Sequence, residues 1–141
     1  MTRETIYSKI QCAIEILLCK DKELFQQNLA ERTITTKFAC YLQEVFKDWD
    51  VDSEYNRDDE KIKALESGKK ILPDIIIHKR KTKKNLLVIE IKKTTNTASD
   101  KDDLRKLSEI KSNFNYEHAL FIRFKAGDSS DVGIERMEWV E

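Results

Sequence analysis

The stretch LPDIIIHKRKTKKNLLVIEIKK, residues 72–93, contains two apolar runs on either side of a basic turn. Both runs are rich in Ile, Leu and Val and are as long as ordinary strands, which predicts buried strands at about 74–79 and 85–92. Because the residues between them are polar, the two strands are expected to pair as an antiparallel hairpin. A carboxylate begins the first strand and a second carboxylate comes near the end of the second.

The position of the turn determines which residues of the two strands face each other. If the turn centres near Thr82, paired residues have numbers that add up to about 164–166, and Asp74 lies opposite residues 90–92. Directly opposed residues share a face of the sheet, and Glu90 and Lys92 share one because side chains alternate along a strand. The spacing therefore predicts that two carboxylates and one ammonium group meet at one end of the sheet.

Such a meeting of charges suits a metal-dependent reaction. Two neighbouring carboxylates raise each other's pKa, and burial raises it further. Mg²⁺ relieves this cost because it binds oxygen ligands and keeps waters and substrate phosphate around it. A nearby lysine can orient a bound water or stabilise charge on a phosphate under attack. These residue types therefore indicate hydrolysis of phosphodiester bonds. A purely structural ion cluster is the alternative, but buried ion pairs contribute little net stability.

The rest of the chain predicts helices on both sides of this hairpin, since apolar residues recur at helical spacing before and after it. The expected elements are a helix at 4–19, a helix from Leu24 or Asn28 to Phe46, a strand at 51–57, a helix at 101–113 with Asp100 as its N-cap, a strand at 118–124 and an edge strand at 132–140. This order predicts an α/β fold with a central mixed β-sheet, a three-strand meander plus further strands, flanked by helices.

The motif Pro-Asp (73–74), followed by an apolar strand and by Glu-Ile-Lys (90–92), resembles that of the PD-(D/E)XK nucleases, the restriction-endonuclease-like superfamily. The order of elements over about residues 28–124 is also similar to the core of that family. The resemblance implies a single nuclease-like domain over 1–141. It implies hydrolysis of DNA with Mg²⁺, for which Mn²⁺ can substitute.

The resemblance also implies a role for each residue of the motif. Asp74 and Glu90 would bind the metal together with the backbone carbonyl of Ile91, and Lys92 would position or activate the attacking water. Many family members add an acidic residue from the helix before the first strand. Glu31 is the candidate here, and the alternative is a glutamate that complements the helix dipole.

Several further residues are candidates for the site or for DNA binding. Glu54 is a candidate metal ligand and Arg57 a candidate phosphate contact, with an edge-strand charge pair as the alternative. Lys106, on the helix after the motif, faces either the site or solvent, and Lys93 is a further candidate for phosphate binding. The basic turn at 78–84 either contacts a DNA backbone or only keeps the hairpin solvated.

Composition limits the classes of function. The 26 basic and 26 acidic residues balance, so no overall charge attracts a polyanion. Cys12, Cys19 and Cys40 lack metal-ligand spacing, and their free thiols indicate a reducing compartment. Cys12 and Cys19, seven apart on one face of the first helix, are expected to pack as apolar residues. His78 is expected near solvent at the end of the hairpin. No apolar run reaches the roughly 20 residues of a membrane helix, so a cytoplasmic protein is predicted.

The balanced charge leaves a second class of function open. The chain would then be a catalytically inactive nuclease-fold protein that binds DNA or acts as a partner subunit. A homodimer, formed through the first helix or the edge strand at 132–140, is a further expectation that rests on architecture alone.

Overall fold

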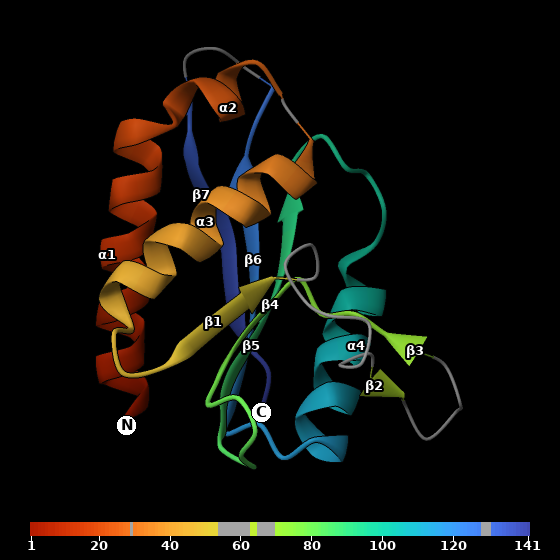
Figure 1. Cartoon of the computed structure of the whole chain (residues 1–141). Coiled ribbons are helices and arrows are strands. Elements are labelled where there is room, and N and C mark those ends of the chain that lie inside the picture. Colours follow the sequence, from red (N-terminus) through yellow and green to blue (C-terminus); the bar gives the residue numbers. More distant parts are fainter. Residues whose placement is uncertain (29, 54–62, 65–69, 128–130) are drawn as a thin grey trace.

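The computed structural model describes residues 1–28, 30–53, 63–64, 70–127 and 131–141, and its centre is a five-stranded mixed sheet (Figure 1). The helices are α1 (Arg3–Lys20), α2 (Lys22–Gln26), α3 (Glu31–Val45) and α4 (Asp100–Asn113). The strands of the sheet are β1 (Asp50–Ser53), β4 (Ile75–His78), β5 (Asn85–Lys93), β6 (His118–Lys125) and β7 (Gly133–Trp139). A separate two-stranded sheet pairs β2 (Lys63–Ala64) with β3 (Lys70–Ile71), and neither strand was expected.

The sheet has the order β1-β4-β5-β6-β7. β1, β4 and β5 form an antiparallel meander, β6 lies parallel to β5, and β7 is the antiparallel edge strand. A parallel pair needs a crossover connection, and α4 provides it (Figure 1). The predicted α/β class, with a mixed sheet flanked by helices, is confirmed.

Helices cover both faces of the sheet, which explains why β4 and β5 are apolar on both sides. Ile75 and Ile77 of β4 and Ile89 of β5 belong to the core beneath α1 and α3. The alternate residues Ile76 and Val88 belong to a second core beneath α4. Neighbouring residues of one strand therefore enter different cores.

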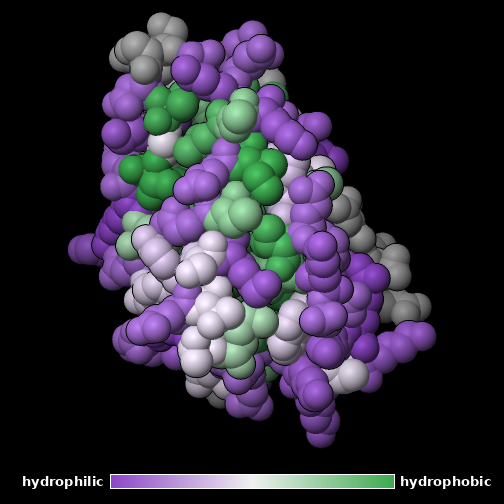
Figure 2. Space-filling view, turned by 90° about the vertical axis from the view of Figure 1, so that its left-hand side faces the viewer, coloured by the Kyte–Doolittle hydropathy of each residue, from purple (hydrophilic) through white to green (hydrophobic). Residues whose placement is uncertain are grey.

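The side of the molecule formed by α1 shows a band of apolar side chains among hydrophilic ones (Figure 2). Leu18 of α1 and Ile134, Met137 and Trp139 of β7 are partly buried apolar residues that pack against the larger core. None of the described helices is both long enough and apolar enough to cross a membrane.

The pairing of β4 with β5 has the predicted register. Ile75 lies opposite Ile89 and Ile76 opposite Val88. One residue further in the same register, Asp74 lies opposite Glu90. The register shifts only towards the turn, between Ile77 and His78, and this irregularity does not affect the open end.

Of the two starts predicted for the second helix, Leu24 is wrong, because that residue belongs to the separate helix α2, and a start near Asn28 is closer to the observed α3. Asn28 has a φ of 53°, in the left-handed region that ends helices. Residue 29 lies outside the described residues, and α3 begins only at Glu31.

The prediction that Asp100 is the N-cap of α4 is wrong. The N-cap is Ser99, whose extended backbone lets its Oγ accept a hydrogen bond from the amide of Lys101 at 3.2 Å. Asp100 is already helical, and its carboxylate binds Arg123 and Arg136 instead. The carboxylate of Asp100 therefore pairs with arginines of neighbouring strands and does not cap the helix.

The prediction that Cys12 and Cys19 pack as apolar residues is also wrong. Cys12, Cys19 and Cys40 are exposed, free thiols. The buried stripe of α1 contains Ile10, Ala13 and other residues that lie beside the cysteines of this helix. A seven-residue spacing predicts a shared helix face but not which face is covered.

We expect Ser99→Ala to lower the free energy of unfolding by about 1 kcal/mol, because it removes the side-chain cap of α4. Ser99→Asp keeps an oxygen acceptor at the cap and should stay close to the wild type. Urea unfolding of the three proteins measures the difference. Equal stability of Ser99→Ala and the wild type would show that Ser99 is not the cap.

Candidate active site

Asp74 and Glu90 meet on the face of the sheet that α4 covers. Asp74 directly precedes β4, and its Oδ2 accepts a hydrogen bond from the amide of Ile91 at 2.7 Å. Glu90 is 3% exposed, and its side chain shares a hydrogen bond with that of Asp74. The structure thus brings together the two carboxyl groups that the register predicts to meet.

Burial is the main cause of an unusual protonation equilibrium at this pair. It raises the pKa of Glu90 well above its ordinary value of 4.5, and the charge of Asp74 raises the pKa further. Lys106 acts in the opposite direction but does not reverse the shift. The two carboxyl groups therefore favour either a shared proton or a cation between them.

Lys106 of α4 is the ammonium group next to this pair. Its Nζ lies 2.7 Å from Oε1 of Glu90 and donates a hydrogen bond to the carbonyl of Leu72 at 3.1 Å. The contact with Glu90 is an ion pair that lowers the pKa of this buried carboxyl group, against the effect of burial. Of the two orientations predicted for Lys106, the structure shows the one that faces the site.

Lys92 does not join the two carboxyl groups, which corrects the prediction that three charges converge. Its Nζ lies 2.5 Å from Oδ2 of Asp103 and donates hydrogen bonds to the carbonyls of Ala98 and Ser99. Lys92 does share a face of β5 with Glu90, as predicted. The start of α4, however, presents acceptors closer to its ammonium group.

The face of α4 that meets the sheet changes character along the helix. The buried or half-buried residues of this face include Asp100, Asp103, the adjacent pair Lys106 and Leu107, and Ile110, so that successive positions are three or four residues apart. The first half of the helix therefore faces charged groups of β5 and β6, and the second half faces apolar ones. The charged residues of the first half continue the helical spacing of the apolar residues towards the N-terminus. This spacing was the sequence signal for a charged face against the sheet, and the prediction did not use it.

Asp100 and Arg123 extend the charged region to β6. Burial acts to raise the pKa of Asp100, but hydrogen bonds from Arg123 and Arg136 outweigh it and lower the pKa. Arg123 also donates hydrogen bonds to the carbonyls of Lys93 and Asn96. These contacts hold the start of α4 against the ends of β5 and β6.

Glu31, the predicted third acidic ligand, lies elsewhere. Its Oε1 accepts hydrogen bonds from the amide of Lys93 at 3.2 Å and from Nδ2 of Asn96 at 3.1 Å, so it holds the turn after β5. No three Asp, Glu, His or Cys side chains in the described part of the chain are grouped to hold a metal ion. Within the described residues, Asp74 and Glu90 are therefore a pair of carboxyl groups without a third acidic neighbour.

The other predicted contacts have different outcomes. Glu54 and Arg57 lie outside the described residues. Lys93 is partly buried and, by the alternation of β5, lies on the face opposite Glu90. Ile91 contributes its amide to Asp74, as described above.

A second buried carboxylate on the same face of the sheet belongs to Asp52 of β1, which was not predicted. Its Oδ2 lies 2.6 Å from Nε2 of His78, and Arg80 binds both carboxylate oxygens. Burial acts to raise the pKa of Asp52, but the hydrogen bonds from Arg80 and His78 lower it overall. The expectation that His78 lies near solvent is wrong, because Asp52 on the neighbouring strand holds it at 7% exposure.

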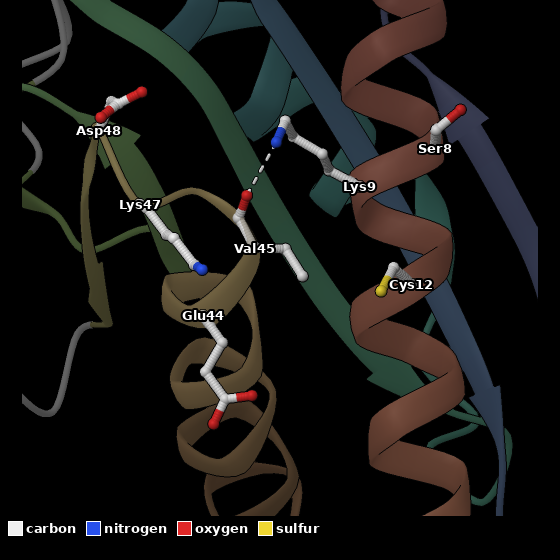
Figure 3. Close-up of a pocket in the computed structure, with 7 residues that line it drawn as sticks. All are labelled: Ser8, Lys9, Cys12, Glu44, Val45, Lys47 and Asp48. Atoms are coloured by element: carbon white, nitrogen blue, oxygen red, sulfur yellow. Dashed lines mark hydrogen bonds between the residues drawn. The ribbon is translucent and has the colours of Figure 1, made fainter.

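A surface pocket of about 540 Å³ lies between α1 and the end of α3, away from these carboxylates (Figure 3). It is lined by Ser8, Lys9, Cys12, Glu44, Val45, Lys47 and Asp48. Lys9 donates a hydrogen bond to the carbonyl of Val45 across it, at 2.9 Å. That contact caps the end of α3, so the pocket has a structural explanation.

The raised pKa of Glu90 predicts a pH-dependent effect of Glu90→Gln on stability. A carboxyl group with a raised folded-state pKa stabilises the fold most below its ordinary pKa and loses this contribution as pH rises through the folded-state pKa. Glutamine cannot ionise, so the stability of Glu90→Gln relative to the wild type should increase as pH rises from 4.5.

Urea unfolding between pH 4.5 and 8 with a metal chelator present measures this difference. Glu15→Gln, at an exposed position on α1, serves as the control and should show no such trend. A difference between Glu90→Gln and the wild type that stays constant with pH would contradict the assignment.

Comparisons of the chain with models of protein families, with curated proteins and with solved structures find no match.

Proposed function

We propose that the protein is a Mg²⁺-dependent nuclease that hydrolyses DNA phosphodiester bonds, with Asp74 and Glu90 as its metal ligands. The observation that carries the proposal is the meeting of these two carboxyl groups on adjacent strands beneath α4. The proposal includes a restriction-endonuclease-like fold and the PD-(D/E)XK mechanism. The meander β1-β4-β5, the crossover helix and the parallel strand β6 support it, because they follow the order of that core.

The residues present fit a divalent cation. Glu90 is almost completely buried, and its pKa is raised by burial and by the neighbouring carboxylate of Asp74. A cation bound by both carboxylates would relieve their repulsion. Two protein ligands would leave the other positions around Mg²⁺ to waters and to substrate phosphate, as this ion prefers.

The chemistry would be divided between the metal and the lysines. Bound Mg²⁺ would lower the pKa of a water and neutralise charge on the phosphate. The resemblance gives the catalytic lysine role to Lys92, but the contacts favour Lys106, which is the ammonium group beside Glu90. There Lys106 can stabilise the charge that develops on the phosphate. Lys92 then acts as a positioning residue that joins β5 to the start of α4.

A second candidate function is supported by the same lysines. Lys106 pairs with Glu90 and Lys92 pairs with Asp103, so each of these carboxylates already has a cationic partner within the chain. An arrangement balanced in this way would serve an inactive nuclease-fold protein that binds DNA or a partner subunit. Metal binding distinguishes the two candidates.

We expect the purified protein to cleave plasmid DNA with Mg²⁺ or Mn²⁺, and Asp74→Asn or Glu90→Gln to lower the rate by about 100-fold or more, because a metal contributes several kcal/mol. Asp102→Asn, at an exposed position on α4, is the control and should stay active. Cleavage that survives both site substitutions would exclude this site. If calorimetry shows no Mn²⁺ binding at millimolar concentration, the inactive protein is the better description.

The two lysines should differ in what their removal changes. We expect Lys106→Met to lower the cleavage rate by about 100-fold and to lower stability less than Lys92→Met does, because Glu90, whose pKa is raised, can take up a proton when its cation is removed. Lys92→Met should lower the free energy of unfolding by about 3 kcal/mol, because it leaves a buried partner uncompensated. Lys101→Met, at an exposed position on the same helix, should change neither quantity. If folded Lys92→Met loses more cleavage than Lys106→Met, Lys92 is the catalytic lysine.

A further inference from the structure

The turn between β4 and β5 gathers five basic side chains. It contains Lys79, Arg80, Lys81, Lys83 and Lys84. Lys81, Lys83 and Lys84 are exposed and form no ion pair within the described part of the chain. Since the whole chain carries no net charge, this positive charge is a local feature. The turn lies at the end of the hairpin away from the start of α4 (Figure 1).

Hydrogen bonds within the turn hold its backbone in one conformation. The amide of Lys79 donates to the carbonyl of Lys84 at 2.9 Å, and the amide of Thr82 donates to the carbonyl of Lys79 at 3.2 Å. The hydroxyl of Thr82 adds a bond to the same carbonyl and accepts one from the amide of Lys84. The three exposed lysines therefore extend from a defined turn, which lowers the entropy lost on binding.

Arg80 anchors this turn to the edge of the sheet. Its guanidinium group binds the buried carboxylate of Asp52, and its amide donates to Oδ2 of Asp50 at 2.9 Å. A buried carboxylate is costly unless it is paired, and a purely apolar edge would have avoided that cost. Through its pairing with Arg80 and His78, Asp52 connects the turn to β1, which explains a buried carboxylate at this edge.

The chemistry of the turn fits a row of phosphate groups. Residues 79–84 carry no apolar or aromatic side chain that could insert into a membrane. Several ammonium groups on one short turn suit a ligand with regularly repeated negative charges, as in a nucleic-acid backbone. The turn also belongs to the same hairpin as Asp74 and Glu90.

We propose that the turn at 79–84 contacts the phosphate backbone of the DNA that the carboxylate site cleaves. Asp74 and Lys79 are five residues apart on one strand, which corresponds to about 16 Å. At 3.4 Å per nucleotide of duplex axis, the turn contacts phosphates about five base pairs from the scissile bond. The protein therefore selects polymeric substrates over short ones. This inference rests on the proposed nuclease function, although binding can be tested without cleavage.

The test compares two triple variants with the same change in charge. One carries Lys81→Gln, Lys83→Gln and Lys84→Gln, and the control carries Lys22→Gln, Lys37→Gln and Lys101→Gln, all at exposed positions elsewhere. Fluorescence anisotropy with a labelled 20-base-pair duplex is recorded over a range of salt concentrations with a metal chelator, so that no DNA is cut. Circular dichroism checks that both variants are folded.

We expect the turn variant to bind the duplex more weakly than the control. The slope of log K against log salt should be shallower by about 0.9 for each lysine that contacts a phosphate. Equal affinities and slopes in the wild type and the turn variant would overturn the proposal. So would wild-type protein that binds vesicles containing phosphatidylserine but not the duplex.

A small substrate separates this proposal from the nuclease function. With Mn²⁺ present, hydrolysis of bis(p-nitrophenyl) phosphate reports on the carboxylate site alone, because this molecule is too short to reach the turn. The turn variant should keep this activity, and Asp74→Asn should lose it. If the turn variant loses this activity as well, the turn is not a separate contact. If wild-type protein binds the duplex but hydrolyses neither substrate, the nuclease function fails and the turn contact stands.

Discussion

The pairing of β4 with β5 is the constraint on which the rest of the structure depends. Its register places Asp74 opposite Glu90 and, through the alternation of side chains, sends Ile75 and Ile76 into different cores. A shift of one residue would place Glu90 on the face of the sheet opposite Asp74 and would separate the two carboxyl groups. The same backbone pairing therefore determines both the core and the candidate site, so one cannot be changed without the other.

The second determinant is α4, which combines packing with charge compensation. Leu107 and Ile110 bury its second half against the sheet. Its first half instead brings Asp103 to Lys92 and Lys106 to Glu90. Charged groups in such positions contribute less to stability than apolar residues would, so their presence is better explained by what they position. A carboxylate pair with a raised pKa in this setting is typical of functional sites.

The site and the basic turn lie at opposite ends of one hairpin, and each has its own set of ionic contacts. At the open end, Asp74 and Glu90 are covered by α4. At the turn, Arg80 is bound to Asp52 of the edge strand. A rigid strand pair joins the two places, so a ligand that contacts both would be held in one alignment. This geometry suits an extended polyanion better than a small molecule, because only a long ligand can contact both the carboxyl groups and the basic turn.

The sequence by itself determined the hairpin, its register and the meeting of Asp74 with Glu90, because strand alternation and turn position are local properties that few residues specify. It also indicated the helices and strands around the hairpin, although the cap of α4 was misassigned by one residue. Only the tertiary structure decided the partners of long charged side chains. Lys92 turns to Asp103, Lys106 to Glu90 and His78 to Asp52, and each of these pairs joins separate elements. Such partners depend on how a helix or edge strand is placed over the sheet, and residue spacing within one element carries no information about that placement.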